Sequence, residues 1–130
     1  MTPEIWAWIN KAESDWRILV REAAVPDAPS LDAVCFHAQQ SAEKYLKARL
    51  LKACMKFLKS HDLLYLHKLA LTVEPGWKFL YHSLSELSTY AVASRYPGLD
   101  PTFEQAQRAI ENCRIVRTTI RLAFDLSIDD

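Results

Sequence analysis

Apolar residues recur along the first part of the chain at the spacing of an α-helix. They follow steps of three and four positions, which place them on one helix face. Thr2, Pro3 and Glu4 are typical of a helix start, with a capping hydroxyl, a proline at the first helical position and an acid in the first turn. Pro26 ends the pattern. The apolar positions of this first predicted helix are Ile5, Ile9, Ala12, Trp16, Leu19 and Ala23.

A second helical pattern begins after Ser30, which is a good cap residue. Neither glycine nor proline follows until Pro75, and apolar residues continue from Leu31. We therefore expect one helix that extends to about Leu58 and forms the central element of the fold.

The rest of the chain predicts a short helix and two longer ones. Residues 60–62 indicate a break, and residues 63–71 can form a short helix. After a Pro-Gly turn, residues 77–93 carry leucines at helical spacing. The last helix opens with Thr102-x-x-Gln105, a capping box. Because no segment alternates with period two, the pattern predicts an all-α protein, an antiparallel (up-down) four-helix bundle with an extra short helix.

Composition agrees with one globular domain over residues 1–130, since half of the residues are hydrophobic and a quarter are charged. The cysteines are odd in number and have no Cys-x-x-Cys or Cys/His metal spacing, which predicts buried free thiols, no metal site and no cofactor. They are Cys35, Cys54 and Cys113. No apolar stretch approaches the length of a membrane span, and no signal peptide pattern is present. We therefore expect a cytoplasmic protein without a membrane partner.

Basic residues cluster although the whole chain is neutral, with 16 Lys and Arg against 16 Asp and Glu. The segment from Lys44 to His61 contains no acid. On continuous helices, two basic stripes form, and these could bind a polyanion or be an ordinary solvated face. The stripe residues are Arg49, Lys52, Lys56 and Lys59 on the second helix and Arg114, Arg117 and Arg121 on the last.

Three segments together carry a family resemblance. Residues 35–48 read CFHAQQSAEKYLKA, residues 59–64 read KSHDLL, and residues 90–98 read YAVASRYPG. In this order and spacing they resemble the HEPN family of small helical proteins, over roughly residues 5–125. The resemblance implies a helical bundle that is usually homodimeric and is often found with a separate minimal nucleotidyltransferase. It also implies that some relatives are toxin-like, metal-independent RNases, whereas others are nucleotide-binding or non-catalytic modules.

The RNase members of this family use an Arg-x4–6-His motif, paired across the dimer. No arginine of this chain precedes a histidine at that spacing, and the nearest imitation is Lys56-x4-His61. Lysine supplies charge but lacks the planar fork that suits a phosphate. The sequence therefore predicts a non-catalytic module for a nucleotide, RNA or a nucleotidyltransferase partner. Two alternatives stay open: a toxin-like RNase with a divergent site that uses His61 with Lys56 or Arg95, and a purely protein-docking subunit.

Two pairs of neighbouring residues are candidate ligand contacts. His61 could act in acid–base chemistry or hold a phosphate beside Asp62; alternatively Asp62 caps the short helix. Arg95 could reach a phosphate while Tyr96 stacks on a base; alternatively Arg95 binds the last helical carbonyls and Tyr96 fills the core.

Lys44 and Lys47 are further ligand candidates, because they share the resembling helix with several polar side chains. Lys47 could instead form an ordinary i,i+4 ion pair with Glu43. On the first helix, Trp6 and Trp8 cannot lie on one face, so at least one should sit near the surface or in an interface. This favours a homodimer.

Overall fold

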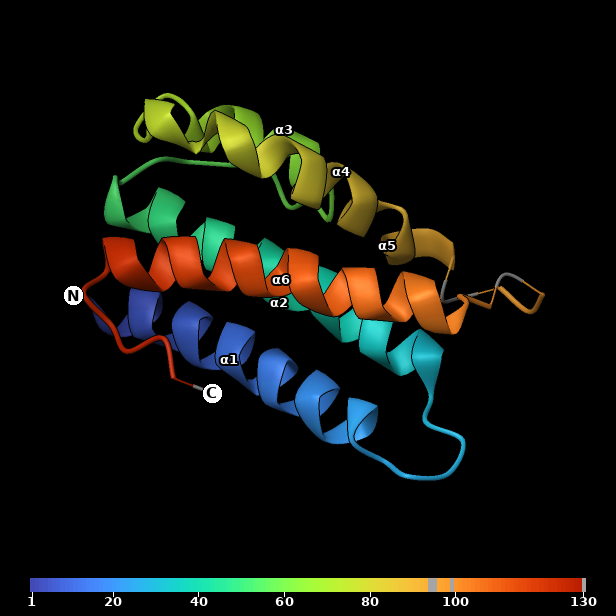
Figure 1. Ribbon diagram of the computed structural model, residues 1–130. Coiled ribbons are helices and arrows are strands. Elements are labelled where there is room, and N and C mark those ends of the chain that lie inside the picture. Colours follow the sequence, from blue (N-terminus) through green and yellow to red (C-terminus); the bar gives the residue numbers. More distant parts are fainter. Residues whose placement is uncertain (94–95, 99, 130) are drawn as a thin grey trace.

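The computed structural model describes residues 1–93, 96–98 and 100–129 (Figure 1). In chain order its helices are α1 (Pro3–Ala23), α2 (Leu31–Lys52), α3 (Leu63–Ala70), the 3-10 helix η1 (Pro75–Leu80), α4 (Tyr81–Ser88), α5 (Tyr90–Ala93) and α6 (Phe103–Ala123). These residues include no β-strand, so the all-α prediction is confirmed. No helix in the described ranges combines the length and the apolar character that crossing a membrane requires.

α2 is the central helix of the molecule. It packs against α1 and α6 and also contacts α3, α4 and α5. Figure 1 shows α1 and α4 running in one direction and α2 and α6 in the other. Because neighbours surround α2, its polar residues are buried together with its apolar ones. This position explains why ionisable side chains of α2 enter the interior.

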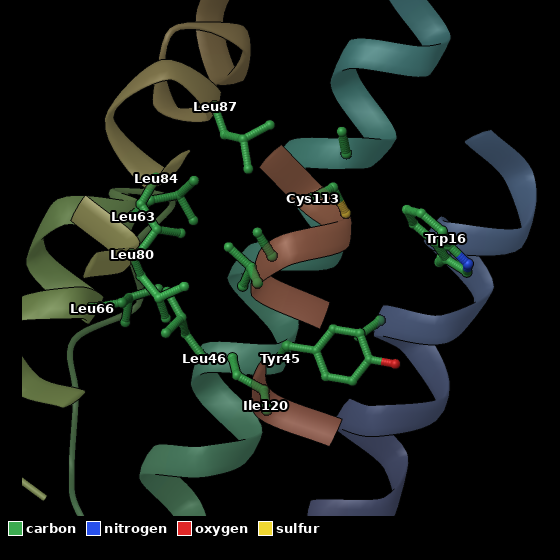
Figure 2. Close-up of a cluster of buried hydrophobic side chains, with 14 of the residues drawn as sticks. Trp16, Tyr45, Leu46, Leu63, Leu66, Leu80, Leu84, Leu87, Cys113 and Ile120 are labelled. Carbon is green, nitrogen blue, oxygen red and sulfur yellow. The ribbon is translucent and has the colours of Figure 1, made fainter. Parts of the chain in front are cut away.

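The core lies on both sides of α2 and α6 (Figure 2). On one side, α3 and α4 contribute leucines such as Leu66 and Leu84, and on the other side α1 contributes Trp16. Each of these side chains is almost fully buried. Trp16 was expected on the apolar face of the first helix, and that face lies in the core.

α2 ends at Lys52, which corrects the prediction that it continues to about Leu58. Cys54 adopts a left-handed conformation with φ of 54°, and the Met55 N–H donates to the Leu50 carbonyl at 3.0 Å. The Cys54 N–H donates to the Leu51 carbonyl at 2.9 Å. These two bonds form a Schellman motif, which usually places glycine where Cys54 stands. Because cysteine and not glycine stands at this position, no local stop signal marks the end of α2.

The predicted third long helix is broken into η1, α4 and α5, so that prediction was wrong in its continuity. At the break after α4, the Thr89 N–H donates to the Glu86 carbonyl, three residues back, at 3.3 Å. The hydroxyls of Ser88 and Thr89 also donate to carbonyls three residues back. Such side-chain bonds compete with the helical pattern and favour an interruption.

The predicted helix starts are confirmed by their caps. The Thr2 hydroxyl accepts from the Ile5 N–H, and the Ser30 hydroxyl accepts from the Ala33 N–H. At α6 both bonds of the capping box are present, between Thr102 and Gln105.

Two of the three thiols are buried, as expected, and one is not. Burial raises the pKa of Cys35 to about 11 and that of Cys113 to about 12. Cys54 is exposed, which corrects the prediction for that residue. It occupies the left-handed position just beyond α2, where the chain turns away from the core.

Candidate functional site

A buried carboxylate, that of Glu43, gathers several polar side chains around the middle of α2. Its side chain is only 2 % exposed. Oε2 accepts from the Lys47 ammonium at 2.9 Å, and Oε1 lies 3.0 Å from Nδ1 of His61. The Gln39 amide donates to the same Oε1 at 3.3 Å and to the His61 carbonyl at 3.2 Å. The network therefore joins α2 to the segment that precedes α3.

Lys47 is buried with Glu43, so the expected i,i+4 pair exists but is not on the surface. The Lys47 ammonium lies 5.2 Å from the ring centre of Trp8 and 6.0 Å from that of Phe57. Removing two charges from water costs several kcal/mol per ion unless each is paired. Lys47 is therefore committed to Glu43 and to two aromatic faces.

His61 and Asp62 have separate roles. The Asp62 carboxylate caps α3, accepting from the N–H groups of Leu64 and Tyr65 at 3.0 and 3.3 Å. The His61 side chain is 63 % exposed and turns toward Glu43 instead. A carboxylate beside Nδ1 favours a proton on that nitrogen, which leaves Nε2 able to accept a proton or bind a ligand.

Next to this network, the surface has an open hollow of about 540 Å³. It lies between the start of α1 and the segment after α2, and it contains the exposed Lys56 and the half-buried Phe57. Phe57 links the hollow to the buried network through its contact with Lys47. The complete lining is Thr2, Glu4, Ile5, Leu51, Cys54, Met55, Lys56 and Phe57.

A second buried carboxylate, Asp15, holds two other polar residues of α2. Its Oδ1 lies 2.7 Å from Nδ1 of His37, and its Oδ2 accepts from Lys44 at 2.6 Å. Lys44 is thus an internal ion-pair partner. Sequence reasoning missed Asp15, although its place among Ala12, Trp16 and Leu19 on the apolar face was a usable signal, because an acid there needs a partner.

The first basic stripe does not form on one helix, because α2 ends at Lys52. Arg49 pairs with Glu74 at 2.9 Å. Lys52 reaches the end of α6, where its ammonium lies 4.9 Å from the ring centre of Phe124. Lys56 and Lys59 are exposed beyond the helix and form no ion pair with any residue in the described part of the chain.

The second basic stripe faces the interior over much of its length. Arg117 is 1 % exposed and its guanidinium donates to Oε1 of Glu13 at 2.7 Å. It also donates to the carbonyls of Ile128 and Asp129, at 3.0 and 2.8 Å, and Arg121 donates to that of Ser127. These bonds fasten the C-terminal residues to α6.

Tyr45 and both arginines surround the Glu13 carboxylate. Burial of Glu13 raises its pKa, but hydrogen bonds from Arg117 and Tyr45 and the charges of Arg117 and Arg121 outweigh this and lower it below 4.5. For Tyr45, burial and the bond to Glu13 raise the pKa. Glu13 therefore stays ionised in the folded protein at neutral pH.

Of the remaining candidates, Arg95 lies outside the described residues. Tyr96 is 58 % exposed and so does not fill the core. Among residues 1–93, 96–98 and 100–129, no group of three or more His, Cys, Asp or Glu side chains is placed to hold a metal ion.

The comparison with protein families agrees with this architecture. The model of the HEPN domain matches residues 5–123, which is nearly the whole chain. The chain therefore belongs to the HEPN domain family. Neither the curated proteins nor the solved structures yielded a match.

Proposed function

We propose that this HEPN domain binds a nucleotide or RNA through the surface formed by residues 52–61. The observation that supports it best is the hollow of about 540 Å³, whose lining includes the exposed Lys56 and the half-buried Phe57. Ligand sites commonly measure roughly 300–1,000 Å³. Phe57 offers a face for a base, and Lys56 a cation for a phosphate.

The distribution of positive charge also supports ligand binding at residues 52–61. Lys52, Lys56 and Lys59 are exposed, and no acid occurs between Lys44 and His61. The other basic residues of the predicted stripes are largely held by carboxylates, as Arg49 is by Glu74. Among the residues of the two predicted stripes, those that remain available to a polyanion are therefore concentrated in this segment.

We also propose that binding occurs without catalysis. His61 is exposed and bonded to Glu43, but the chain has no Arg-x4–6-His motif, and the lysine at the matching distance is Lys56. A cation that lacks the bidentate fork provides weaker stabilisation of a phosphorane-like transition state.

Free thiols fit a cytoplasmic location.

Assembly into a homodimer, or with a minimal nucleotidyltransferase protein, is part of the proposal. Trp6 is 39 % exposed on α1, and Trp8 is turned toward Lys47, so the two rings lie on different faces as expected. An exposed tryptophan is a typical interface anchor.

Replacing Lys56 with glutamine tests the proposed surface. We expect roughly fivefold weaker binding of a fluorescently labelled RNA, together with a smaller dependence of affinity on salt, because one phosphate contact is lost. Fluorescence anisotropy at two salt concentrations measures both quantities. Lys78→Gln is the matched control, since Lys78 is also exposed but does not line the hollow. Equal affinities for both variants and the wild type would contradict the proposal.

A further inference from the structure

His61 has one ring nitrogen that is available to a ligand on the residue 52–61 surface. The side chain is 63 % exposed, and its Nδ1 lies 3.0 Å from Oε1 of Glu43. The other nitrogen, Nε2, forms no hydrogen bond with any residue in the described part of the chain. The buried carboxylate therefore holds one side of the ring and leaves the other side open.

The Glu43 carboxylate determines which nitrogen of neutral His61 carries the proton. This carboxylate is ion-paired with Lys47 at 2.9 Å and only accepts hydrogen bonds, so Nδ1 must donate to it. In a neutral imidazole one nitrogen is a donor and the other is an acceptor. Nε2 of neutral His61 is therefore a hydrogen-bond acceptor on an exposed side chain.

The segment that carries His61 is held in place before any ligand arrives. The Gln39 amide donates to the His61 carbonyl at 3.2 Å, and the Tyr65 hydroxyl accepts from the Leu58 N–H at 3.0 Å. Figure 1 shows the chain between α2 and α3 returning along α2. A ligand thus meets an acceptor whose position is already set, which lowers the ordering cost of binding.

His61 is placed to contact the backbone of the proposed ligand and not its base. It does not line the hollow in which Phe57 offers a face for stacking. The two residues are connected through Lys47, whose ammonium lies 6.0 Å from the Phe57 ring centre and is paired with Glu43. Lys59 is exposed and precedes His61 by two positions, which separates their Cα atoms by at most about 7 Å. A phosphate bound by Lys59 brings its own sugar within reach of His61.

We propose that Nε2 of His61 accepts a hydrogen bond from the 2′-hydroxyl of a ribose, so that this surface selects RNA over DNA. The inference rests on the proposed ligand binding by residues 52–61. The 2′-hydroxyl distinguishes the two backbones, and it is a donor as well as an acceptor. The lysines of the segment attract both polymers through their phosphates and do not make this distinction.

Three oligonucleotides of one sequence test the inference: RNA, DNA, and 2′-O-methyl RNA, in which the methyl group removes the donor and keeps the oxygen. Fluorescence anisotropy measures their affinities at pH 8, where histidine is ordinarily neutral. We expect the wild type to bind RNA about fivefold more tightly than the other two, which is the effect of one hydrogen bond. In His61→Ala this preference should vanish while the affinity for DNA stays the same.

His82→Ala is the matched control and should keep the preference for RNA. His82 is also exposed beside a carboxylate, with Nε2 3.0 Å from Glu86, but it lies on α4. The tautomer of His61 is measured separately, from the nitrogen chemical shifts of its ¹⁵N-labelled ring without ligand. A neutral ring with its proton on Nε2 would overturn the proposal. Equal affinity for RNA and 2′-O-methyl RNA, or a preference that survives in His61→Ala, would do the same.

Lys56→Gln separates this inference from the proposed function. It should weaken the binding of all three oligonucleotides and leave the preference for RNA unchanged, because its ammonium contacts a phosphate. Equal binding of RNA and DNA that Lys56→Gln weakens would overturn the inference and leave the proposed function standing. Absence of binding to all three would contradict the proposed function and the inference with it.

Discussion

Glu43→Ala is expected to lower the free energy of unfolding by about 4 kcal/mol, more than any other single polar substitution in this chain. The change removes the carboxylate but leaves the Lys47 ammonium in a site where its side chain is 8 % exposed. Gln39 and His61 lose an acceptor at the same time. Urea unfolding monitored by circular dichroism measures the loss.

Two comparisons make this result specific. Glu111→Ala removes an exposed acid, 65 % accessible in its pair with Arg114, and should change stability by less than about 0.5 kcal/mol. The double variant Glu43→Leu/Lys47→Met replaces the buried pair by apolar side chains and should recover most of the stability, since neither charge is then left alone. A Glu43→Ala protein as stable as wild type would show that the pair is not buried.

Arg117→Met is expected to lower the free energy of unfolding by about 3 kcal/mol at pH 7. Methionine fills much of the space, but it cannot donate to Glu13 or to the carbonyls of Ile128 and Asp129. The C-terminal residues lose two of the bonds that hold them. We therefore also expect faster proteolysis near the C-terminus, measured by mass spectrometry after brief protease treatment.

The effect of Arg117→Met should depend on pH in a defined direction. In the wild type, Glu13 has a pKa below its ordinary value of 4.5, so its stabilisation is present above that pH and is lost as the pH falls through the lower folded-state value. Without Arg117 the folded-state pKa of Glu13 rises. The stability difference between wild type and variant should therefore shrink when the pH falls from 6 to 3. A constant difference would contradict the assigned pairing, and Lys78→Met, at an exposed lysine without an ion-pair partner among the described residues, is the control.

The sequence predicted the elements well where a local signal exists. Thr2, Ser30 and Thr102 are capping residues that act within one helical turn, and each begins a helix as expected. The end of α2 could not be predicted in the same way, because Cys54 takes the left-handed position without being glycine. Two backbone hydrogen bonds close the turn there, from the Met55 N–H to the Leu50 carbonyl and from the Cys54 N–H to the Leu51 carbonyl, and no glycine marks it in the sequence.

The site was predictable only in part, since a linear pattern does not show which charges meet. Lys44 and Lys47 look available on a helical wheel, yet Asp15 and Glu43 bind them inside the fold. The partner of Arg117 lies 104 positions away in sequence. His61 and Lys56 remain on the surface, and these two keep their place as candidates.

Incubation of the purified protein with labelled RNA at low and high salt, with binding and cleavage read from one gel, tests whether this HEPN domain binds RNA without cutting it. We expect a complex that dissociates as salt rises, with RNA that stays intact for both wild type and His61→Ala. Cleavage by the wild type that His61→Ala abolishes would instead establish a nuclease with a divergent site. A protein that neither binds nor cleaves the RNA would contradict the proposed function and would favour a protein-docking role.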